Sequence, residues 1–213
     1  MDNICIFEDY NYENFLPLTY SRPVFELRCG FKNLREKIEF YFPEAKIYLL
    51  MRDYLKSLFS NNGLIFDKST KGNVLFINGR TLMKERPDIK EEGIYYSGNE
   101  IAFIYLNEKT ANTLDIYEYN DIERLKKIGL KEFKIANINL IKYPWDIIKE
   151  NCNEIKREFS LYSSNEDTTT LDIDIMGDKK HVHIGKDVVA EKNIVFDVRK
   201  GPIYIGDNTD IRA

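Results

Sequence analysis

The sequence is notable first for what it lacks. No apolar run reaches the roughly 18 residues of a membrane-spanning helix, and the opening MDNICIFEDY has neither the basic region nor the cleavage site of a signal peptide. The three cysteines, Cys5, Cys29 and Cys152, are odd in number and far apart, which argues against a disulfide framework and a zinc site. A formal net charge of −4 argues against a broad nucleic-acid-binding surface. We expect a cytoplasmic protein with free thiols that binds neither membrane nor nucleic acid.

The first half of the chain alternates short apolar runs with helical patterns. The runs at 3–9, 45–51 and 73–79 are typical of buried strands in a parallel sheet. Segments near 31–42 and 53–61 between them have the spacing of amphipathic helices. Strands that alternate with helices predict βαβ units and the α/β class, with a Rossmann-like domain.

The middle of the chain changes character. Residues 93–106 predict a hairpin that turns at Ser97-Gly98-Asn99, and residues 132–141 alternate like a strand. Residues 143–162 predict a long helix. Its expected apolar stripe consists of Ile148, Cys152, Ile155 and Phe159. Three further segments are expected as a polar loop and two short helices: 10–15, 110–116 and 121–128.

After residue 171 the hydrophobic pattern takes a period of six, with Ile184, Ala190 and Phe196 six apart. The segments IGKDVV, AEKNIV and IGDNTD are imperfect copies of one hexapeptide, typical of a parallel β-helix with about 18 residues per coil. A divergent pair of short strands is the alternative interpretation.

The change of pattern predicts three parts in the chain. We expect an α/β domain at 1–162, a linker and leading strand at 163–180, and β-helix coils at 181–213. The printed sequence stops in the middle of a repeat, which we interpret as a truncated piece of a longer protein or a natural stub. Open coil edges seek partners, so a homo-oligomer formed through the β-helix is expected.

Three segments resemble one known family: LPLTYSRP at 16–23, YPWDIIKEN at 143–151, and VHIGKDVVAEKNIVFDVRKGPIYIGDNTDI at 182–211. It is the bifunctional family that joins a sugar-1-phosphate nucleotidyltransferase domain to a left-handed β-helix acyltransferase domain. The chain is most similar to its divergent branch, related to the enzyme that forms UDP-N-acetylglucosamine. The resemblance covers nearly the whole chain. It implies a Rossmann-like domain followed by the start of a left-handed parallel β-helix, with Mg²⁺, a nucleotide and a sugar phosphate as ligands.

The chain departs from the family where phosphates would bind. Ordinary members carry a Gly-Gly-x-Gly-Thr-Arg loop before Pro-Leu-Thr, and glycines let backbone N–H groups approach a phosphate. Here Pro17-Leu18-Thr19 and Arg22-Pro23 match, but the preceding loop is EDYNYEN and Val24 replaces a lysine. The resemblance makes Arg22 the candidate phosphate contact. A surface arginine packed against Tyr20 is the alternative.

Two further residues of this segment are candidates for substrate binding. The resemblance places Thr19 in the lining of the nucleotide pocket, and Arg28 is one of the nearest cations.

The expected metal site also departs from the family. Asn78-Gly79 stands where the family has Gly-Asp, and Asn78 and Arg80 are expected to face the sugar phosphate as catalytic residues. An Asn-Gly turn after a buried strand is the alternative. Asp146 matches a family aspartate, either as a substrate contact or as a residue that starts a helix. The metal ligands stay unassigned.

The only two histidines, His181 and His183, are two apart and so are expected on one face of a strand. Such a pair could bind a metal or act as a base, but too few ligands lie nearby, and a solvent-facing role is favoured.

Two functions therefore remain open. The first is nucleotidyl transfer from an NTP to a sugar 1-phosphate, which gives an NDP-sugar and pyrophosphate. The second is a catalytically degenerate domain that binds a ligand or supports assembly, with acyl transfer residing in β-helix coils that this sequence lacks. The absence of the family's glycines, lysine and aspartate is the feature that bears on this choice. Losing one such contact commonly lowers the rate of an enzyme by about 10²–10³, so the loss of several is the argument for the degenerate domain.

Overall fold

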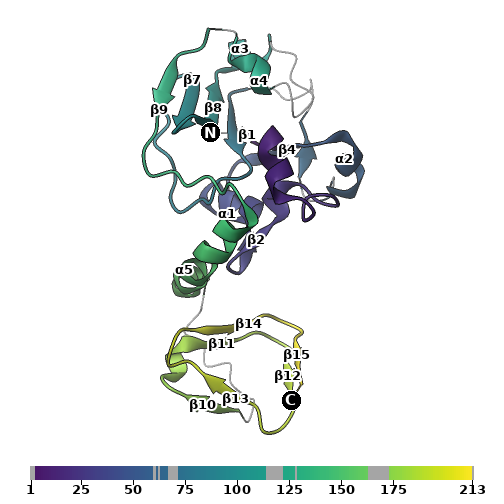
Figure 1. The fold of residues 1–213 in the computed structure, drawn as a ribbon, viewed down its shortest axis with the longest axis vertical. Coiled ribbons are helices and arrows are strands. Elements are labelled where there is room, and N and C mark those ends of the chain that lie inside the picture. The colour runs from purple at the N-terminus through teal and green to yellow at the C-terminus, as the bar shows by residue number, and fades with distance from the viewer. Residues whose placement is uncertain are drawn as a thin grey trace. The chain divides into compact units, whose positions relative to one another are not determined.

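The computed structural model describes residues 3–59, 61, 63–66, 72–113, 122–127, 129–162 and 173–212 (Figure 1). The chain divides into two compact units, Met1–Lys149 and Glu150–Ala213, which we name the α/β unit and the coil unit. The domain boundaries expected from the sequence stay a prediction. No helix in the described ranges is long and apolar enough to cross a membrane.

The α/β unit is built on one seven-stranded sheet with the strand order β5-β4-β1-β6-β8-β7-β9. Strands β5, β4, β1 and β6 run parallel, β8 and β7 add an antiparallel hairpin, and β9 lies parallel to β7. The strands are β1 (Asn3–Phe7), β4 (Lys46–Leu50), β5 (Leu64–Ile65), β6 (Val74–Asn78), β7 (Gly93–Ser97), β8 (Glu100–Leu106) and β9 (Glu132–Lys134). The expected mixed α/β class with a mainly parallel sheet is confirmed.

Strand β1 lies at the centre of the sheet and is buried on both faces. Ile4 and Ile6 belong to one hydrophobic cluster, whereas Cys5 and Phe7 belong to another. Because successive side chains of a strand point to opposite faces, both faces of β1 are covered. The continuous apolar run in the sequence reflects this double burial.

Short helices and a small hairpin complete the unit. Helix α1 (Leu34–Tyr41) begins after a capping box. In this box the Asn33 side chain accepts from the Glu36 backbone N–H, and the Glu36 side chain accepts from the Asn33 backbone N–H. The elements are the hairpin β2 (Arg28–Cys29) and β3 (Lys32–Asn33), and the helices α1 (Leu34–Tyr41), α2 (Asp53–Phe59), α3 (Glu108–Ala111), α4 (Ile122–Leu125) and α5 (Pro144–Tyr162), the last of which continues into the coil unit.

Three local expectations were wrong. Residues 10–15 form a 3₁₀ helix rather than a polar loop, because the Asp9 side chain accepts a hydrogen bond from the Asn11 N–H and caps it. The strand expected over 132–141 is limited to β9. The two short helices are shorter than expected, and parts of 110–116 and 121–128 lie outside the described residues.

The apolar stripe expected along α5 is correct at Phe159, which is buried, and at the half-buried Ile155, but wrong at Ile148 and Cys152. Ile148 is 73% exposed and Cys152 is exposed, whereas Glu154 and Glu158 are buried. Arg157 pairs with Glu154 at 2.7 Å, which offsets the cost of burying that carboxylate. A periodicity of apolar residues gives no information on such a pairing.

Beyond the end of α5, the described part of the coil unit contains three pairs of parallel strands. The pairing joins Asp174 to Val195, Val182 to Ile203 and Val189 to Asp210, so each partner lies 21 residues further along the chain. Figure 1 shows the pairs on three sides of a closed turn. The strands are β10 (Asp174–Met176), β11 (Val182–Ile184), β12 (Val189–Ala190), β13 (Val195–Asp197), β14 (Ile203–Ile205) and β15 (Asp210–Ile211).

The coil repeat is longer than expected from the hexapeptides. The starts of β10, β11, β12 and β13 are 8, 7 and 6 residues apart, so only the last step keeps the period of six. Two corners 21 residues apart share one conformation, with φ of 55° at Asp187 and 56° at Asn208. Asp and Asn tolerate this left-handed region better than most residues, which favours a repeat of these turns.

The first prediction concerns the stacking of the coils at Gly185. An added Cβ at Gly185 would lie 2.5 Å from the backbone nitrogen of Asp207 in the next coil. We expect Gly185→Ala to destabilise the coil by about 1–3 kcal/mol, the range for overpacking. Hydrogen exchange of the Val189 amide, which donates to Thr209 O at 2.9 Å, measures this loss as faster exchange.

Gly206→Ala is the matched control, because it occupies the same corner 21 residues later and an added Cβ there meets nothing within 4 Å. Equal exchange rates in the two variants would contradict the close approach at Gly185.

Candidate functional site

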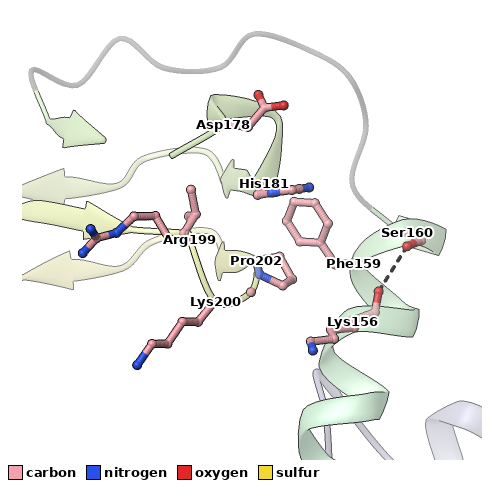
Figure 2. A pocket seen from close by; sticks show the side chains of 10 residues that line it. Lys156, Phe159, Ser160, Asp178, His181, Arg199, Lys200 and Pro202 are labelled. Atoms are coloured by element: carbon pink, nitrogen blue, oxygen red, sulfur yellow. Dashed lines mark hydrogen bonds between the residues drawn. The ribbon is translucent and has the colours of Figure 1, made fainter. Parts of the chain in front are cut away.

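A cavity of about 510 Å³ lies within the coil unit (Figure 2). Its wall includes Phe159, His181 and the basic residues Lys156, Arg199 and Lys200. Arg199 is bound to Asp197 at 2.7 Å, and its hydrogen bonds lower the pKa of Asp197 to about 2. The cationic side chains in the wall are exposed, so the cavity has no buried polar group that would select a ligand.

The two histidines do not share a strand face as expected. His181 ends a 3₁₀ turn at Lys179–His181, whereas His183 lies in β11 and stacks on Tyr204 with ring centroids 4.4 Å apart. Only His183 therefore belongs to a strand. Within the ranges described above, no group of three or more His, Cys, Asp or Glu side chains is arranged to hold a metal ion.

The stronger candidate is the edge of the sheet where β1, β4 and β6 end, which we name the carboxyl edge. Phe7, Leu50 and Asn78 are aligned in the register of these parallel strands. The residues that follow the three strands therefore meet at one edge, the usual place for ligands in α/β sheets.

Arg52, just after β4, forms a buried ion pair with Glu8, just after β1. Arg52 is 4% exposed and Glu8 is fully buried, with Arg52 Nε 2.8 Å from Glu8 Oε2. Arg52 Nη2 also donates to the carbonyl oxygens of Thr19 at 2.7 Å and Arg22 at 3.1 Å. Its guanidinium carbon lies 3.9 Å from the centre of the Tyr12 ring, a cation–π contact. One side chain thus fixes the segment that replaces the glycine loop.

Burial raises the pKa of the Glu8 carboxyl above its usual value, against the opposing effect of Arg52. A raised pKa means that the folded state binds this proton more tightly than the unfolded chain does. The contribution of Glu8 to stability is therefore largest at low pH and declines as the pH rises through the raised pKa. Protonation of Glu8 at low pH therefore does not destabilise the folded protein.

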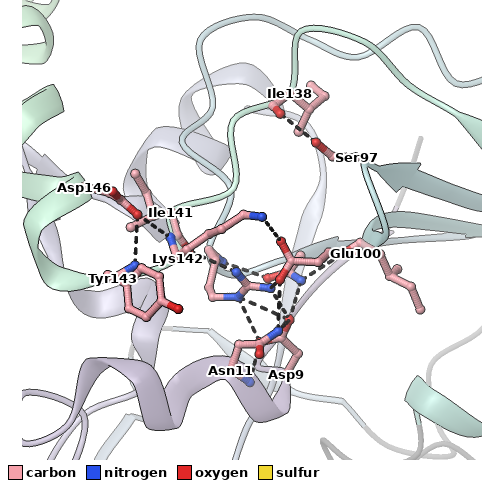
Figure 3. Close-up of polar contacts among 12 residues, drawn as sticks. Asp9, Asn11, Ser97, Glu100, Ile138, Ile141, Lys142, Tyr143 and Asp146 are labelled. Carbon is pink, nitrogen blue, oxygen red and sulfur yellow. Dashed lines mark hydrogen bonds and ion pairs between the residues drawn. The ribbon is translucent and has the colours of Figure 1, made fainter.

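Arg80, just after β6, forms a second buried cluster with Asp9 and Glu100 (Figure 3). Arg80 is 0% exposed, and its Nη2 lies 2.6 Å from Asp9 Oδ2 and 3.1 Å from Glu100 Oε1. Its Nε binds Asp9 Oδ1 at 3.0 Å, and its Nη1 donates to Ile141 O at 3.0 Å. Lys142 Nζ lies 3.0 Å from Glu100 Oε2. Two carboxylates and two cations balance the charge of the cluster.

The electrostatics of this cluster keep Arg80 charged. Burial lowers the pKa of its guanidinium, but the hydrogen bonds and charges of Asp9 and Glu100 outweigh burial and raise it. Asn78 is fully buried beside it and donates to Asp9 Oδ2 at 2.9 Å and Ile101 O at 2.8 Å. The Asn78 Oδ1 atom accepts from the Arg80 backbone N–H at 3.0 Å.

The candidate site residues from the sequence differ in their burial and in their contacts. Asn78 and Arg80 come together in the buried cluster and are not exposed to solvent. Thr19 is buried and donates its hydroxyl to Tyr12 O at 2.9 Å. Arg22 and Arg28 are exposed, and the Arg28 guanidinium donates to Phe31 O. Their roles toward a substrate stay predictions.

Asp146 lies in the first turn of α5. One of its carboxylate oxygens, Oδ2, accepts hydrogen bonds from the backbone N–H groups of Lys142 and Tyr143, each at 3.0 Å. Its alternative role in starting the helix is therefore confirmed, and a substrate contact stays a prediction.

The sequence analysis missed Arg52 and Glu100, and it included Glu8 and Asp9 only as part of the loop at 8–15 that was expected to line the nucleotide pocket, without assigning either carboxylate a partner. Glu8 and Asp9 directly follow the apolar run of β1, and Arg52 comes two residues after β4. Their positions just beyond buried strands of a parallel sheet were the available signal. Glu100 gave no such signal, because it opens a strand of an antiparallel hairpin.

The expected Mg²⁺ does not fit the donors at this edge. Mg²⁺ requires oxygen ligands at about 2.0–2.1 Å in near-octahedral geometry. Both Asp9 oxygens are bound to the Arg80 guanidinium, and the Asn78 amide directs its N–H rather than its oxygen at Asp9. The adjoining cavity measures only about 110 Å³ and has Asp9, Asn11 and Glu100 in its wall.

The second prediction tests the buried Arg52 pair. Arg52→Met removes the guanidinium and leaves Glu8 without its cation, so we expect a loss of about 3–5 kcal/mol in the free energy of unfolding. Denaturant unfolding followed by tryptophan fluorescence and circular dichroism measures it. Lys90→Ala, which removes an exposed pair with Asp88, is the control and should leave the unfolding midpoint nearly unchanged, because water and salt screen an exposed pair. Equal effects would show that the Arg52 pair adds no more than a surface pair.

A family model described as "Sugar nucleotidyl transferase" matches residues 4–167. A solved structure from Bacillus anthracis, assigned as a glucose-1-phosphate thymidylyltransferase in complex with sucrose, is 11% identical, covers 73% of this chain and 95% of that chain, and has a TM-score of 0.40. No curated protein sequence matches this chain. Because the family model spans more than half of the sequence, the chain belongs to the sugar nucleotidyl transferase family.

Proposed function

We propose that the α/β unit transfers a nucleotidyl group from an NTP to a sugar 1-phosphate. The observation that carries this proposal is the family model, which matches from residue 4 through the whole seven-stranded sheet. The carboxyl edge of that sheet is the place where ligands bind in related α/β architectures.

In this reaction a phosphate oxygen of the sugar 1-phosphate attacks the α-phosphorus of the NTP. The bond between the α-phosphorus and its bridging oxygen to the β-phosphate breaks, and pyrophosphate leaves with the electron pair. The chain must hold the two phosphate-bearing substrates in line and neutralise the charge that develops.

Arg22 is the candidate for that neutralisation. Its backbone oxygen is held by Arg52, which fixes the main chain, while its side chain is exposed. Its guanidinium has no hydrogen bond or ion pair to the part of the chain that the structure describes, so its donors are available for phosphate oxygens. An arginine fork can bind two such oxygens at once.

A ligand-binding or assembly module without catalysis is the second candidate. The observation that favours it is that the two buried arginines, Arg52 and Arg80, bind carboxylates and carbonyls of the chain itself. Neither offers a cation to a triphosphate. Under this proposal the edge binds a nucleotide sugar without turning it over.

For the coil unit we propose the start of a left-handed parallel β-helix that supports self-association. The three parallel strand pairs with a common 21-residue step support this proposal. Acyl transfer, the activity of the resembling bifunctional family, would require further coils.

The third prediction tests Arg22. We expect Arg22→Ala to weaken binding of an NTP or NDP-sugar by about 1.5–3 kcal/mol, the range for a hydrogen bond to a charged group. Arg22→Lys should restore only part of the affinity, because the fork is lost. Calorimetric titration with several nucleotides, with and without Mg²⁺, gives these values, and mass spectrometry of NTP and sugar 1-phosphate mixtures reports turnover.

Lys46→Ala is the control, because Lys46 is exposed at the opposite end of β4. Nucleotide binding that is unchanged in Arg22→Ala would reject Arg22 as the phosphate contact. Binding without any NDP-sugar product would favour the non-catalytic module.

A further inference from the structure

We infer that Arg80 provides a permanent cation at the carboxyl edge, in the place where the carboxylates Asp9 and Glu100 would otherwise need a divalent metal ion. The inference goes beyond the proposed function and holds whether or not the unit transfers a nucleotidyl group. It concerns only the chain's own charges and their contacts.

The first argument is geometric. The guanidinium meets the Asp9 carboxylate side-on, with Nε 3.0 Å from Oδ1 and Nη2 2.6 Å from Oδ2. In such a fork, two parallel N–H groups donate to the two carboxylate oxygens. The same Nη2 lies 3.1 Å from Glu100 Oε1, so one nitrogen joins the two carboxylates. This is the arrangement in which a bridging cation neutralises an acidic pair.

The second argument is burial. Arg80 is 0% exposed, and the Ile141 carbonyl and the Asn78 side chain hold the head group and the backbone in place. A surface ion pair exchanges its partners with water, whereas a fully buried cation stays with the carboxylates that compensate it. Arg80 is therefore part of the folded structure.

The third argument compares the two buried arginines. Arg52 pairs with one carboxylate, Glu8, and binds carbonyl oxygens with its remaining donors. Arg80 joins two carboxylates, each partly accessible, with side-chain exposures of 14% for Asp9 and 25% for Glu100. Removal of Arg80 leaves Asp9 and Glu100 with Lys142 as the remaining cation of the cluster, so the two accessible carboxylates carry an excess negative charge that a divalent ion could reach. Removal of Arg52 instead leaves a single, enclosed carboxylate, Glu8.

The fourth prediction follows from this difference, and its probe is Mn²⁺ in the absence of nucleotide. We expect Mn²⁺ to leave the melting temperature of the wild type unchanged. Arg80→Met should melt at a lower temperature, and millimolar Mn²⁺ should raise that temperature by about 3 °C or more, because an ion that binds only the folded state stabilises it. Arg52→Met is the matched control, which should lose stability without recovery in Mn²⁺.

A second measurement keeps the inference testable if Arg80→Met does not fold. Electron paramagnetic resonance of Mn²⁺ with the wild-type chain should show only the free ion. A bound ion in the wild type that is lost in Asp9→Asn would overturn the inference, because the carboxylates would then hold a metal beside Arg80. A folded Arg80→Met that gains no stability from Mn²⁺ would also overturn it.

Discussion

The carboxyl edge of the sheet depends on the buried guanidinium of Arg52. It joins the end of β4 to Glu8 at the end of β1 and takes the carbonyl oxygens of Thr19 and Arg22 as further partners. Glu8 in turn accepts from the Val24 backbone N–H at 3.0 Å. The chain between the 3₁₀ helix at Tyr10–Phe15 and the 3₁₀ turn at Val24–Glu26 is thus held by the side chains of Arg52 and Glu8. A glycine loop does the opposite and turns backbone N–H groups toward a bound phosphate.

Arg80 repeats this solution on the other side of β1. In both clusters an arginine that follows a parallel strand pairs with an acidic residue that follows β1. Glu8 pairs with Arg52, after β4, and Asp9 pairs with Arg80, after β6. Successive residues of an extended chain face opposite ways, which explains why one dipeptide can serve two arginines. The edge gains rigidity from this arrangement but loses two cations that could otherwise face a ligand. The closed charge balance also explains why the donor set suits a guanidinium better than Mg²⁺.

The sequence predicted the strands that form the carboxyl edge, but it did not predict which charged side chains pair there. The apolar runs of β1, β4 and β6 required burial on both faces of a sheet, and this is a local signal. The clusters are not local, because Glu8 and Arg52 are 44 residues apart, and Asp9 and Arg80 are 71 apart. Periodicity says nothing about which charges meet across that distance. The same limit explains the error on α5, where an acid was buried through its pairing with Arg157.

The edge contains two kinds of cation, of which only the exposed kind could meet a ligand. Arg52 and Arg80 are shielded from water, so salt in the solution scarcely weakens their pairs. Arg22 is exposed, and so is Lys142, although Lys142 also pairs with Glu100. Attraction between exposed cations and a phosphate declines as the ionic strength rises, because the screening length is about 8 Å at physiological salt. Affinity for a phosphorylated ligand should therefore decrease with salt while the edge that holds Arg22 in place stays intact. Under the proposed function, the framework of this edge and the charge that binds a phosphate would therefore be supplied by separate residues.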